Sequence, residues 1–505
     1  MTAILRRAIG SMALNALKVI VSFATGILVA RGLGAEDYGT LAFLIASFTN
    51  SRMLLDMGTS AAFFTFISKS ERPLQFFFYY GCWLGIQLII SLAFIVLIAP
   101  DDWIDSIWQG QQRFMVILTF AAIFSQQTIW MAITHVSESQ RLTIRMQKTN
   151  LYIVLCHFIV VLLLVRTETI AIEYVLLFIA LEFLLASVYM IRFFDYPSTV
   201  SDYSLQETFR EYRNYCMPLL PFVWISMVSG LANRWLLQHF SGSSEQAYYA
   251  VAVQFSTVAF LIATPVFNIL WKEVSEAKHQ GDFAKLHYVY GRISRSVILI
   301  SACFAGVCLP WTEAIISTVL GPQYMAAVMP LKIMLVFSLW QSLGAVNINM
   351  LYALELTRSR TVIGISFALI SLPLTYYVLA PNSAYLPGWD LGASGLALKM
   401  VLLGASTQNV YAWWISRKME WKFDWSSQFV VAFTCVITGY LWYYFVSAFA
   451  YEGMNVVILM VVGMLGYLVT IISMAFMAPF LLGLVSEDAN MIKHLVLKSF
   501  DQERS

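Results

Sequence analysis

Long apolar stretches separated by short polar links run through the whole of this 505-residue chain. A helix needs about 20 mostly apolar residues to cross the hydrocarbon core of a bilayer, which is about 30 Å thick. The pattern predicts an all-α polytopic membrane protein with about fourteen transmembrane helices. The stretches 150–165 and 293–310 are short, so thirteen is the alternative count. The predicted helices lie at residues 12–30, 38–60, 74–98, 113–135, 150–165, 170–191, 215–238, 247–270, 293–310, 330–353, 361–380, 392–415, 427–447 and 455–480.

Lys and Arg collect in alternate links between these helices, and cytoplasmic links are the ones that carry such an excess. If the N-terminus is cytoplasmic, the outward links hold only Arg31, Arg113 and Arg166. We therefore predict that both termini are cytoplasmic. The apolar run after Arg6 and Arg7 is longer than that of a typical signal peptide, so we expect it to be retained as the first helix.

Composition excludes a soluble globular domain, because hydrophobic residues make up 59% of the chain and charged residues 12%. The net charge of +2 gives no indication of a nucleic-acid partner. We interpret the six cysteines as packing residues and expect neither a disulfide nor a structural metal, because they lie in or beside apolar stretches without a C-x-x-C spacing.

Residues 28–64 and 231–270 share one pattern, which indicates an internal repeat. In each, an Arg in or at the end of one helix is followed by a polar link with Gly and an acid, then by a Tyr that opens the next helix. A helix breaker follows, Gly58 in one segment and Pro265 in the other. Both pairs of helices run outward and then inward, so the repeat would be parallel, with an axis along the membrane normal.

Several stretches resemble one family of membrane transporters. They read LVARGLGAEDYG, LLDMGTSAAFFTFIS, NRWLLQHF, YYAVAVQ and VLGPQYMAAVMPLKIM. In order and spacing along nearly the whole chain, the sequence resembles the polysaccharide-transport flippases of the MOP exporter superfamily, the Wzx-type O-antigen flippases. Many relatives have an acid before the Arg at position 234, where this chain has Asn233.

The resemblance implies a MATE-like fold with two pseudo-symmetric six-helix lobes around a V-shaped cavity. The corresponding segments are an N-terminal lobe at 1–195, a cytoplasmic connector at 196–214, a C-terminal lobe at 215–415, two additional helices at 427–480 and a cytoplasmic tail at 481–505.

The resemblance also implies a function without enzymatic chemistry. It is the movement of an undecaprenyl-diphosphate-linked oligosaccharide, a repeat unit of O-antigen, capsule or exopolysaccharide, from the cytoplasmic to the periplasmic leaflet of the bacterial inner membrane. The implied partners are this lipid-linked oligosaccharide, membrane lipids, a glycan polymerase and a chain-length regulator.

Charged residues inside the predicted helices indicate what a cavity would bind. An ionisable side chain at the bilayer centre costs about 2.5–3.5 kcal/mol even on insertion scales, so such residues seldom face lipid. Five cations against two acids predict a cavity that attracts anions. The cations are Lys18, Arg52, Arg234, Lys332 and Lys399, and the acids are Asp56 and Glu182.

Several of these residues also have a structural interpretation. Lys18 and Lys332 lie near helix ends, where long side chains reach the interface. Arg31 is interpreted as an interfacial anchor that could meet the diphosphate on exit. Arg52 and Asp56 are four residues apart and could neutralise each other.

Arg234 and Lys399 have no acid within a turn on their own helices, so we expect them to contact substrate. Glu182 is a candidate site for proton or sodium coupling, or else a paired or protonated carboxyl. Pro265 and Gly58 are candidate hinge residues, because both weaken a helix. The alternative is a static kink.

The motif DDWID, with Asp101, Asp102 and Asp105, resembles the D-D-x-x-D of prenyl-diphosphate enzymes that bind magnesium. There is no second Asp-rich motif to complete such a site, so we interpret it as an amphipathic interfacial turn beside Trp103 and Trp108. No cofactor is expected.

Three other functions are weaker alternatives. A drug or small-molecule antiporter of the same superfamily would need an acidic cavity. A membrane glycan polymerase or ligase would need a large outward loop with catalytic residues. A purely structural scaffold protein would not explain the intramembrane cations.

Reporter fusions test the predicted topology. Fusions after residues 105, 320 and 385 should report the periplasm, and fusions after 143, 280 and 420 the cytoplasm, because the inward links hold nearly all loop cations. A reversed pattern at two of the six positions would contradict the helix assignment.

Overall fold

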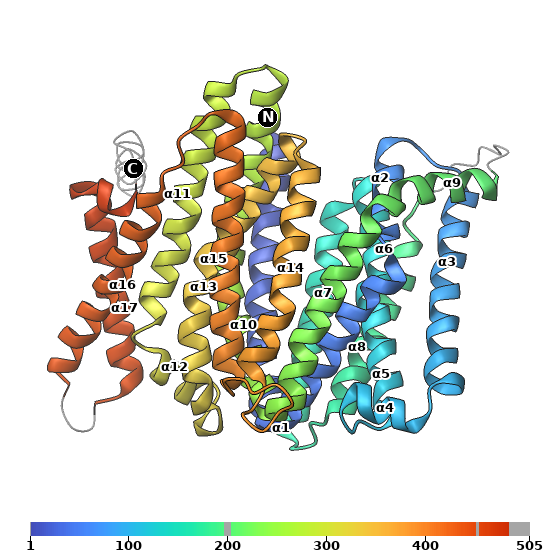
Figure 1. The fold of residues 1–505 in the computed structure, drawn as a ribbon, viewed down its shortest axis with the longest axis horizontal. Coiled ribbons are helices and arrows are strands. Elements are labelled where there is room, and N and C mark those ends of the chain that lie inside the picture. Colours follow the sequence, from blue (N-terminus) through green and yellow to red (C-terminus); the bar gives the residue numbers. More distant parts are fainter. Residues whose placement is uncertain (1, 196–203, 451–453, 484–505) are drawn as a thin grey trace. The chain divides into compact units, whose positions relative to one another are not determined.

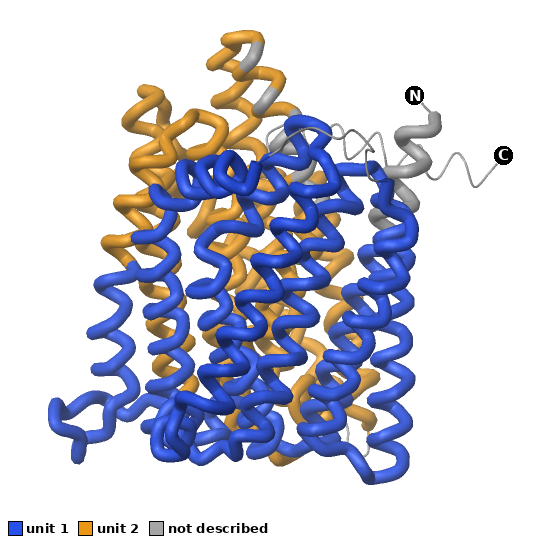
Figure 2. Tube along the Cα trace, turned by 90° about the vertical axis from the view of Figure 1, so that its right-hand side faces the viewer, with its two compact units in different colours: residues 1–247, 368–392 blue, residues 248–367, 393–505 orange. Residues whose placement is uncertain are grey.

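The computed structural model describes residues 2–195, 204–450 and 454–483, apart from the side chains of 2–13 and of part of 265–279. All regular structure in these ranges is helical. The chain divides into two compact units (Figure 2). Unit 1 comprises residues 1–247 and 368–392, and unit 2 comprises 248–367 and 393–505. The predicted division into two six-helix lobes and a tail uses other bounds and stays a prediction.

Unit 1 is built from helices that run alongside one another, with α4 and α9 at opposite ends (Figure 1). It also takes the first part of α10 (Leu220–His279) and the last part of α14 (Thr357–Leu379). Its other elements are α1 (Thr2–Asp56), α2 (Thr59–Lys69), α3 (Leu74–Ala93), η1 (Phe94–Ile98), α4 (Asp101–Trp108), α5 (Arg113–Phe124), η2 (Ser125–Ile129), α6 (Trp130–Ser139), α7 (Thr143–Arg166), α8 (Ile172–Ile191), α9 (Leu205–Cys216) and η3 (Met217–Leu219).

Unit 2 holds the remainder of α10 and α14. Its other elements are α11 (Phe283–Cys308), α12 (Thr312–Val319), η4 (Pro322–Ala327), α13 (Val328–Ala353), α15 (Gly392–Met419), α16 (Trp425–Ala448), α17 (Val456–Met477) and η5 (Pro479–Leu482). Helix α11 packs against both α13 and α16. Its Gly306 lies against the backbone of α16, where an added Cβ would come within 2.5 Å of the Cys435 carbonyl oxygen. All six cysteines are free thiols.

The described residues contain 11 helical segments that are long and apolar enough to cross a membrane. Two of them, Leu14–Asp56 and Leu205–Thr264, have 43 and 60 residues. At 1.5 Å per residue these are much longer than a bilayer core of about 30 Å. Each contains one glycine outside the helical region, Gly34 or Gly242, which divides it into two helices. With α15, the described chain has the predicted fourteen helices of spanning length.

Gly34 and Gly242 have the same backbone conformation, with φ 80° and ψ 173° in the first and φ 83° and ψ −178° in the second. Only glycine adopts this region readily. The links expected at about 31–37 and 239–246 are therefore shorter than predicted, since one residue makes each break. This shared geometry supports the internal repeat seen in the sequence.

The two breaks bring α1 and α10 close together within unit 1. A Cβ on Gly39 would lie 1.7 Å from the Ser243 carbonyl oxygen, and one on Gly230 would lie 2.0 Å from Oδ1 of Asn50. Thr40 donates a hydrogen bond to the Ser243 hydroxyl at 3.2 Å. Small residues at this crossing let the two backbones approach, as is common between membrane helices.

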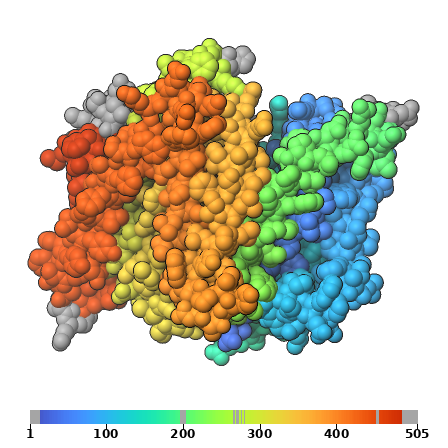
Figure 3. Space-filling view, in the orientation of Figure 1, coloured from blue at the N-terminus to red at the C-terminus, as the bar shows by residue number. Residues whose placement is uncertain are grey.

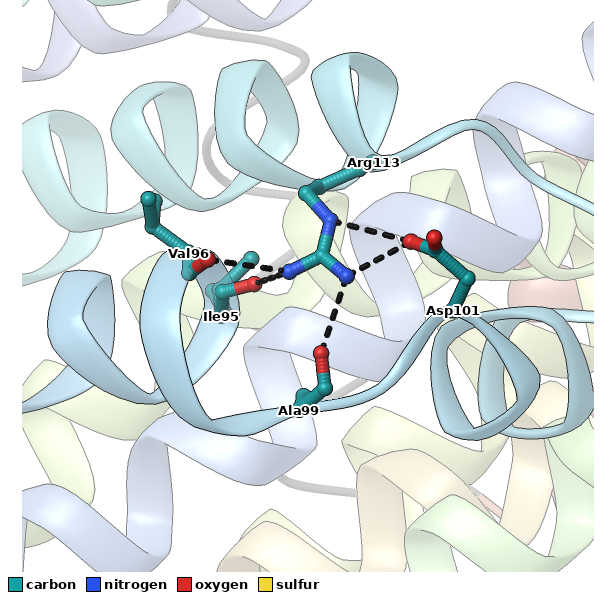
Figure 4. Close-up of polar contacts among 5 residues, drawn as sticks. All are labelled: Ile95, Val96, Ala99, Asp101 and Arg113. Atoms are coloured by element: carbon teal, nitrogen blue, oxygen red, sulfur yellow. Dashed lines mark hydrogen bonds and ion pairs between the residues drawn. The ribbon is translucent and has the colours of Figure 1, made fainter.

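The DDWID motif forms α4, at one end of unit 1. Arg113 donates hydrogen bonds to the carbonyls of Ile95, Val96 and Ala99 and forms an ion pair with Asp101 at 2.6 Å (Figure 4). Trp108 is buried and stacks on Phe48 with ring centroids 5.5 Å apart. Arg113, at the start of α5, thus joins the end of η1 to the start of α4.

Helix α9 lies in the predicted connector and exposes most of its side chains at the surface of unit 1 (Figure 3). Ser204 caps it by accepting a hydrogen bond from the Glu207 amide at 3.1 Å. Its exposed Leu205 and Phe209 beside charged residues are typical of a helix that lies in the membrane interface.

The two candidate hinge residues differ in what the structure describes. Gly58 has φ 82° and separates α1 from α2, so the second predicted helix is broken there. Asp56 stabilises the break by accepting hydrogen bonds from the amides of Gly58 and Ser60. Helix α10 continues through position 265, and the side chain of Pro265 lies outside the described residues.

Replacing Gly242 by Ala should destabilise the protein by about 1–3 kcal/mol, because a Cβ disfavours this backbone conformation. An added Cβ there meets no atom within 4 Å, so the loss would come from the backbone alone. The melting temperature of the purified protein measures it. The control is Gly85→Ala, in the middle of α3, where the space is equally open and Ala favours the helix. Equal melting temperatures for Gly242→Ala and wild type would contradict the role of this break.

Candidate functional site

Charged side chains within the apolar helices are the candidate functional groups, and each unit contributes some. Unit 1 holds Lys18, Arg31, Arg52 and Arg234 with the acids Asp56 and Glu182. Unit 2 holds Lys332 and Lys399.

Arg52 lies in the second half of α1 and is partly buried. Its Nη1 donates a hydrogen bond to the Gln127 carbonyl at 3.0 Å, and its buried Nε has no hydrogen-bond partner among the described residues. Gln127 belongs to η2, a π-helical turn, and π turns free backbone carbonyls and are frequent at functional sites. The Gln127 side chain binds Thr49 at 3.0 Å, so α1 and η2 are joined by polar contacts.

Asp56 caps α2, although it lies one helical turn from Arg52. Its carboxylate accepts hydrogen bonds from the amide of Ser60 at 3.0 Å and from the amide of Gly58 at 3.2 Å. The structure shows no ion pair between the described residues Arg52 and Asp56. Mutual neutralisation of the two charges stays a prediction.

Arg234 lies eight residues before the Gly242 break. Its guanidinium donates a hydrogen bond to Oε1 of Gln246 at 3.3 Å, and the Gln246 amide donates back to the Arg234 carbonyl. Gln246 is fully buried, so the two halves of α10 are held together across the break. The preceding Asn233 accepts a hydrogen bond from Thr375 of α14 at 2.8 Å.

Glu182 has a partner that the sequence analysis missed. Its Oε2 lies 3.0 Å from Nδ1 of His157, which is near the middle of α7. Both side chains are largely buried, with exposed fractions of 13% and 17%. The other carboxyl oxygen of Glu182 is buried and has no hydrogen-bond partner within the described ranges. A carboxyl and an imidazole at this depth can share or exchange a proton.

The two candidate lysines of unit 2 differ in how far they are exposed. Lys399 of α15 is 1% exposed and is among the largest fully buried side chains. Lys332 lies near the start of α13 and pairs with the exposed Glu313 at 3.3 Å, which agrees with a position near the interface. Of the remaining cations, Arg31 is exposed three residues before Gly34, and Lys18 is partly buried in α1.

Three residues that contact the candidate side chains were not identified from the sequence: Gln127, His157 and Gln246. The sequence signal for His157 is a lone imidazole inside an apolar stretch, which is as unusual there as a carboxylate. Gln127 and Gln246 carry no such signal, because uncharged amides are common in helices. Only their contacts to Arg52 and Arg234 identify them.

The structure shows no cluster of three or more His, Cys, Asp or Glu side chains that could hold a metal ion within the described ranges. Asp101 of the DDWID motif pairs with Arg113.

Known structures share this fold. The lipid II flippase MurJ, in an inward closed conformation, matches with a TM-score of 0.68 at 14% identity, over 91% of this chain and 97% of that one. A multidrug resistance MATE family transporter of the MOP superfamily, facing inward, matches with a TM-score of 0.60 at 13% identity, over 80% and 94%. A MOP superfamily transporter from Pyrococcus furiosus matches with a TM-score of 0.56 at 13% identity, over 83% and 95%.

At these identities the structural matches establish the fold, which is the MATE-like fold predicted from the sequence. No curated protein matches the sequence. The model of the family described as polysaccharide biosynthesis protein matches residues 4–270, which is more than half of the chain. The chain therefore belongs to the polysaccharide biosynthesis protein family.

Proposed function

We propose that this protein is a flippase that moves an undecaprenyl-diphosphate-linked oligosaccharide from the cytoplasmic to the periplasmic leaflet of the bacterial inner membrane, with both termini in the cytoplasm. The glycan is a repeat unit of O-antigen, capsule or exopolysaccharide, and the protein acts as a transporter without enzymatic chemistry. A glycan polymerase and a chain-length regulator would act on the product. Family membership and the flippase fold support this proposal.

The observation that carries the proposal is the charge of Arg52. An arginine at this depth is costly unless it is paired or serves a ligand. Here its hydrogen bond goes to a neutral carbonyl, its Nε has no partner in the described part of the chain, and the nearest acid on its helix caps α2. A guanidinium binds phosphate oxygens through two parallel hydrogen bonds, so a diphosphate is a suitable ligand.

Arg234 and Lys399 are the other proposed substrate contacts, with Lys18, Lys332 and Arg31 as secondary positions along the path. In this mechanism the cationic groups attract the diphosphate. They are accessible first from one leaflet and then from the other as the protein changes conformation. Gly58 and Pro265 are the proposed hinges, because each interrupts or weakens a spanning helix.

Replacing Arg52 by Gln should lower surface glycan by about tenfold, which corresponds to about 1.4 kcal/mol of lost diphosphate binding. Arg52→Lys should retain part of the activity, because it keeps the charge. Glycan on intact cells, normalised to protein in the membrane fraction, measures the effect. Arg166→Gln, at the exposed end of α7, removes the same charge and should have no effect. Normal glycan with Arg52→Gln, or an equal loss in the control, would argue against a cationic substrate path.

We also propose that Glu182 and His157 couple transport to protons, because they form the one acid–imidazole contact found within spanning helices of the described chain. Glu182→Gln keeps the size and a hydrogen bond to His157 but cannot release a proton. In proteoliposomes it should abolish the acceleration of transport by a proton gradient and leave exchange without a gradient unchanged. Glu173→Gln, at the start of α8, is the matched control. If Glu182→Gln still responds to the gradient, the pair is structural.

A further inference from the structure

A pocket of about 250 Å³ lies among α11, α15 and α16 of unit 2. It is close to the end of α15, the start of α16 and the short link between them. Ser416 lies three residues before the end of α15, about 25 Å along that helix from Lys399. The pocket is therefore separate from Lys399, the buried intramembrane cation of the same unit.

Two serine hydroxyls that line this pocket have no partner among the described residues. Ser294 of α11 is 2% exposed and Ser416 of α15 is 9% exposed. The Oγ atoms of both are buried and make no hydrogen bond within the described part of the chain. A buried hydroxyl without a partner is unfavourable, so two of them at one pocket indicate a polar ligand.

Cations line the same pocket. Arg295 of α11 has a side chain that is 20% exposed, and its Nη1 lies 4.0 Å from Oδ2 of Asp424. The other carboxyl oxygen of Asp424 caps α16 by accepting hydrogen bonds from the Ser427 amide at 3.2 Å and the Ser426 hydroxyl at 2.9 Å. Lys422 also lines the pocket. Two cations and one acid leave an excess of positive charge.

The link that carries Lys422 is held in place by aromatic contacts. His287 stacks on Trp421 with ring centroids 5.0 Å apart, and its Nε2 lies 3.3 Å from the Lys422 carbonyl. Trp421 bonds back to the Ser416 carbonyl through its amide at 2.8 Å. The pocket is thus a fixed part of the fold, and Trp side chains at helix ends are typical of the level of the lipid head groups.

We propose that this pocket binds a phosphate group, and that the group belongs to the head of an anionic phospholipid. Phosphate oxygens accept hydrogen bonds from hydroxyls and pair with guanidinium and ammonium groups, and the pocket supplies all three. A metal cation is a poorer ligand, because Arg295 would repel it. A lipid is favoured over a free phosphate because basic pockets between membrane helices at the interface bind such head groups. The site is additional to the proposed transport function and does not depend on it.

The double variant Ser294→Ala/Ser416→Ala tests the proposal in purified full-length protein in phosphate-free detergent. Without ligand it should melt at the same temperature as wild type or higher, because two unpaired hydroxyls are removed. Phosphatidylglycerol should raise the melting temperature of wild type, and the double variant should need about tenfold more of it for the same rise, a loss typical of missing hydrogen bonds to a charged group. Arg295→Gln should lose the response as well.

Arg417→Gln is the matched control, because it removes one charge next to Ser416 but lies outside the pocket lining. It should respond to phosphatidylglycerol as wild type does. An equal loss in this control, or a double variant that responds like wild type, would overturn the proposed site. A rise with inorganic phosphate at matched ionic strength but not with phosphatidylglycerol would overturn the lipid as the source. If Arg295→Gln does not fold, the double variant alone decides the test.

Discussion

The structure depends on one constraint, which is that polar groups inside a hydrocarbon layer must find partners within the protein. For the backbone this requires continuous helices, because each unpaired amide or carbonyl costs several kcal/mol. The chain changes direction inside its two longest apolar segments with only one non-helical residue each, Gly34 and Gly242. These breaks leave few backbone groups unpaired. They also bring α1 against the first part of α10, where Gly39 and Gly230 permit close contact.

The same constraint governs the charged side chains. Arg113 binds three carbonyls, two in η1 and one just after it, and pairs with Asp101, so it closes a corner of unit 1. Asp56 performs a similar task for α2. Arg52 is different, because its buried Nε has no partner among the residues that the structure describes, and its hydrogen bond goes to a carbonyl within a π turn. This contrast separates structural charges from a candidate for substrate binding.

The lengths of the apolar stretches were sufficient for the helices and their number, because a bilayer imposes a length that can be counted along the sequence. The fold itself was indicated by the resemblance to the MOP exporters. The position of the first break was also predictable from Gly34 and its neighbours. The hydrogen-bond and ion-pair partners of the charged groups could not be predicted from the sequence. Arg52 and Asp56 are correctly spaced for an ion pair, yet a nearby helix end competes for the carboxylate. Glu182 has no partner along its own helix, and only the packing of α8 on α7 brings His157 to it.

The most direct test of the central claim is leaflet-specific quenching of a fluorescent polyprenyl-diphosphate oligosaccharide in proteoliposomes. The account predicts that the purified protein exposes the probe of the inner leaflet much faster than protein-free vesicles do. It further predicts no acceleration for a neutral glycolipid with the same prenyl chain and sugar, because the cationic side chains recognise the diphosphate. Equal rates for the two lipids, or no acceleration of either, would contradict the account.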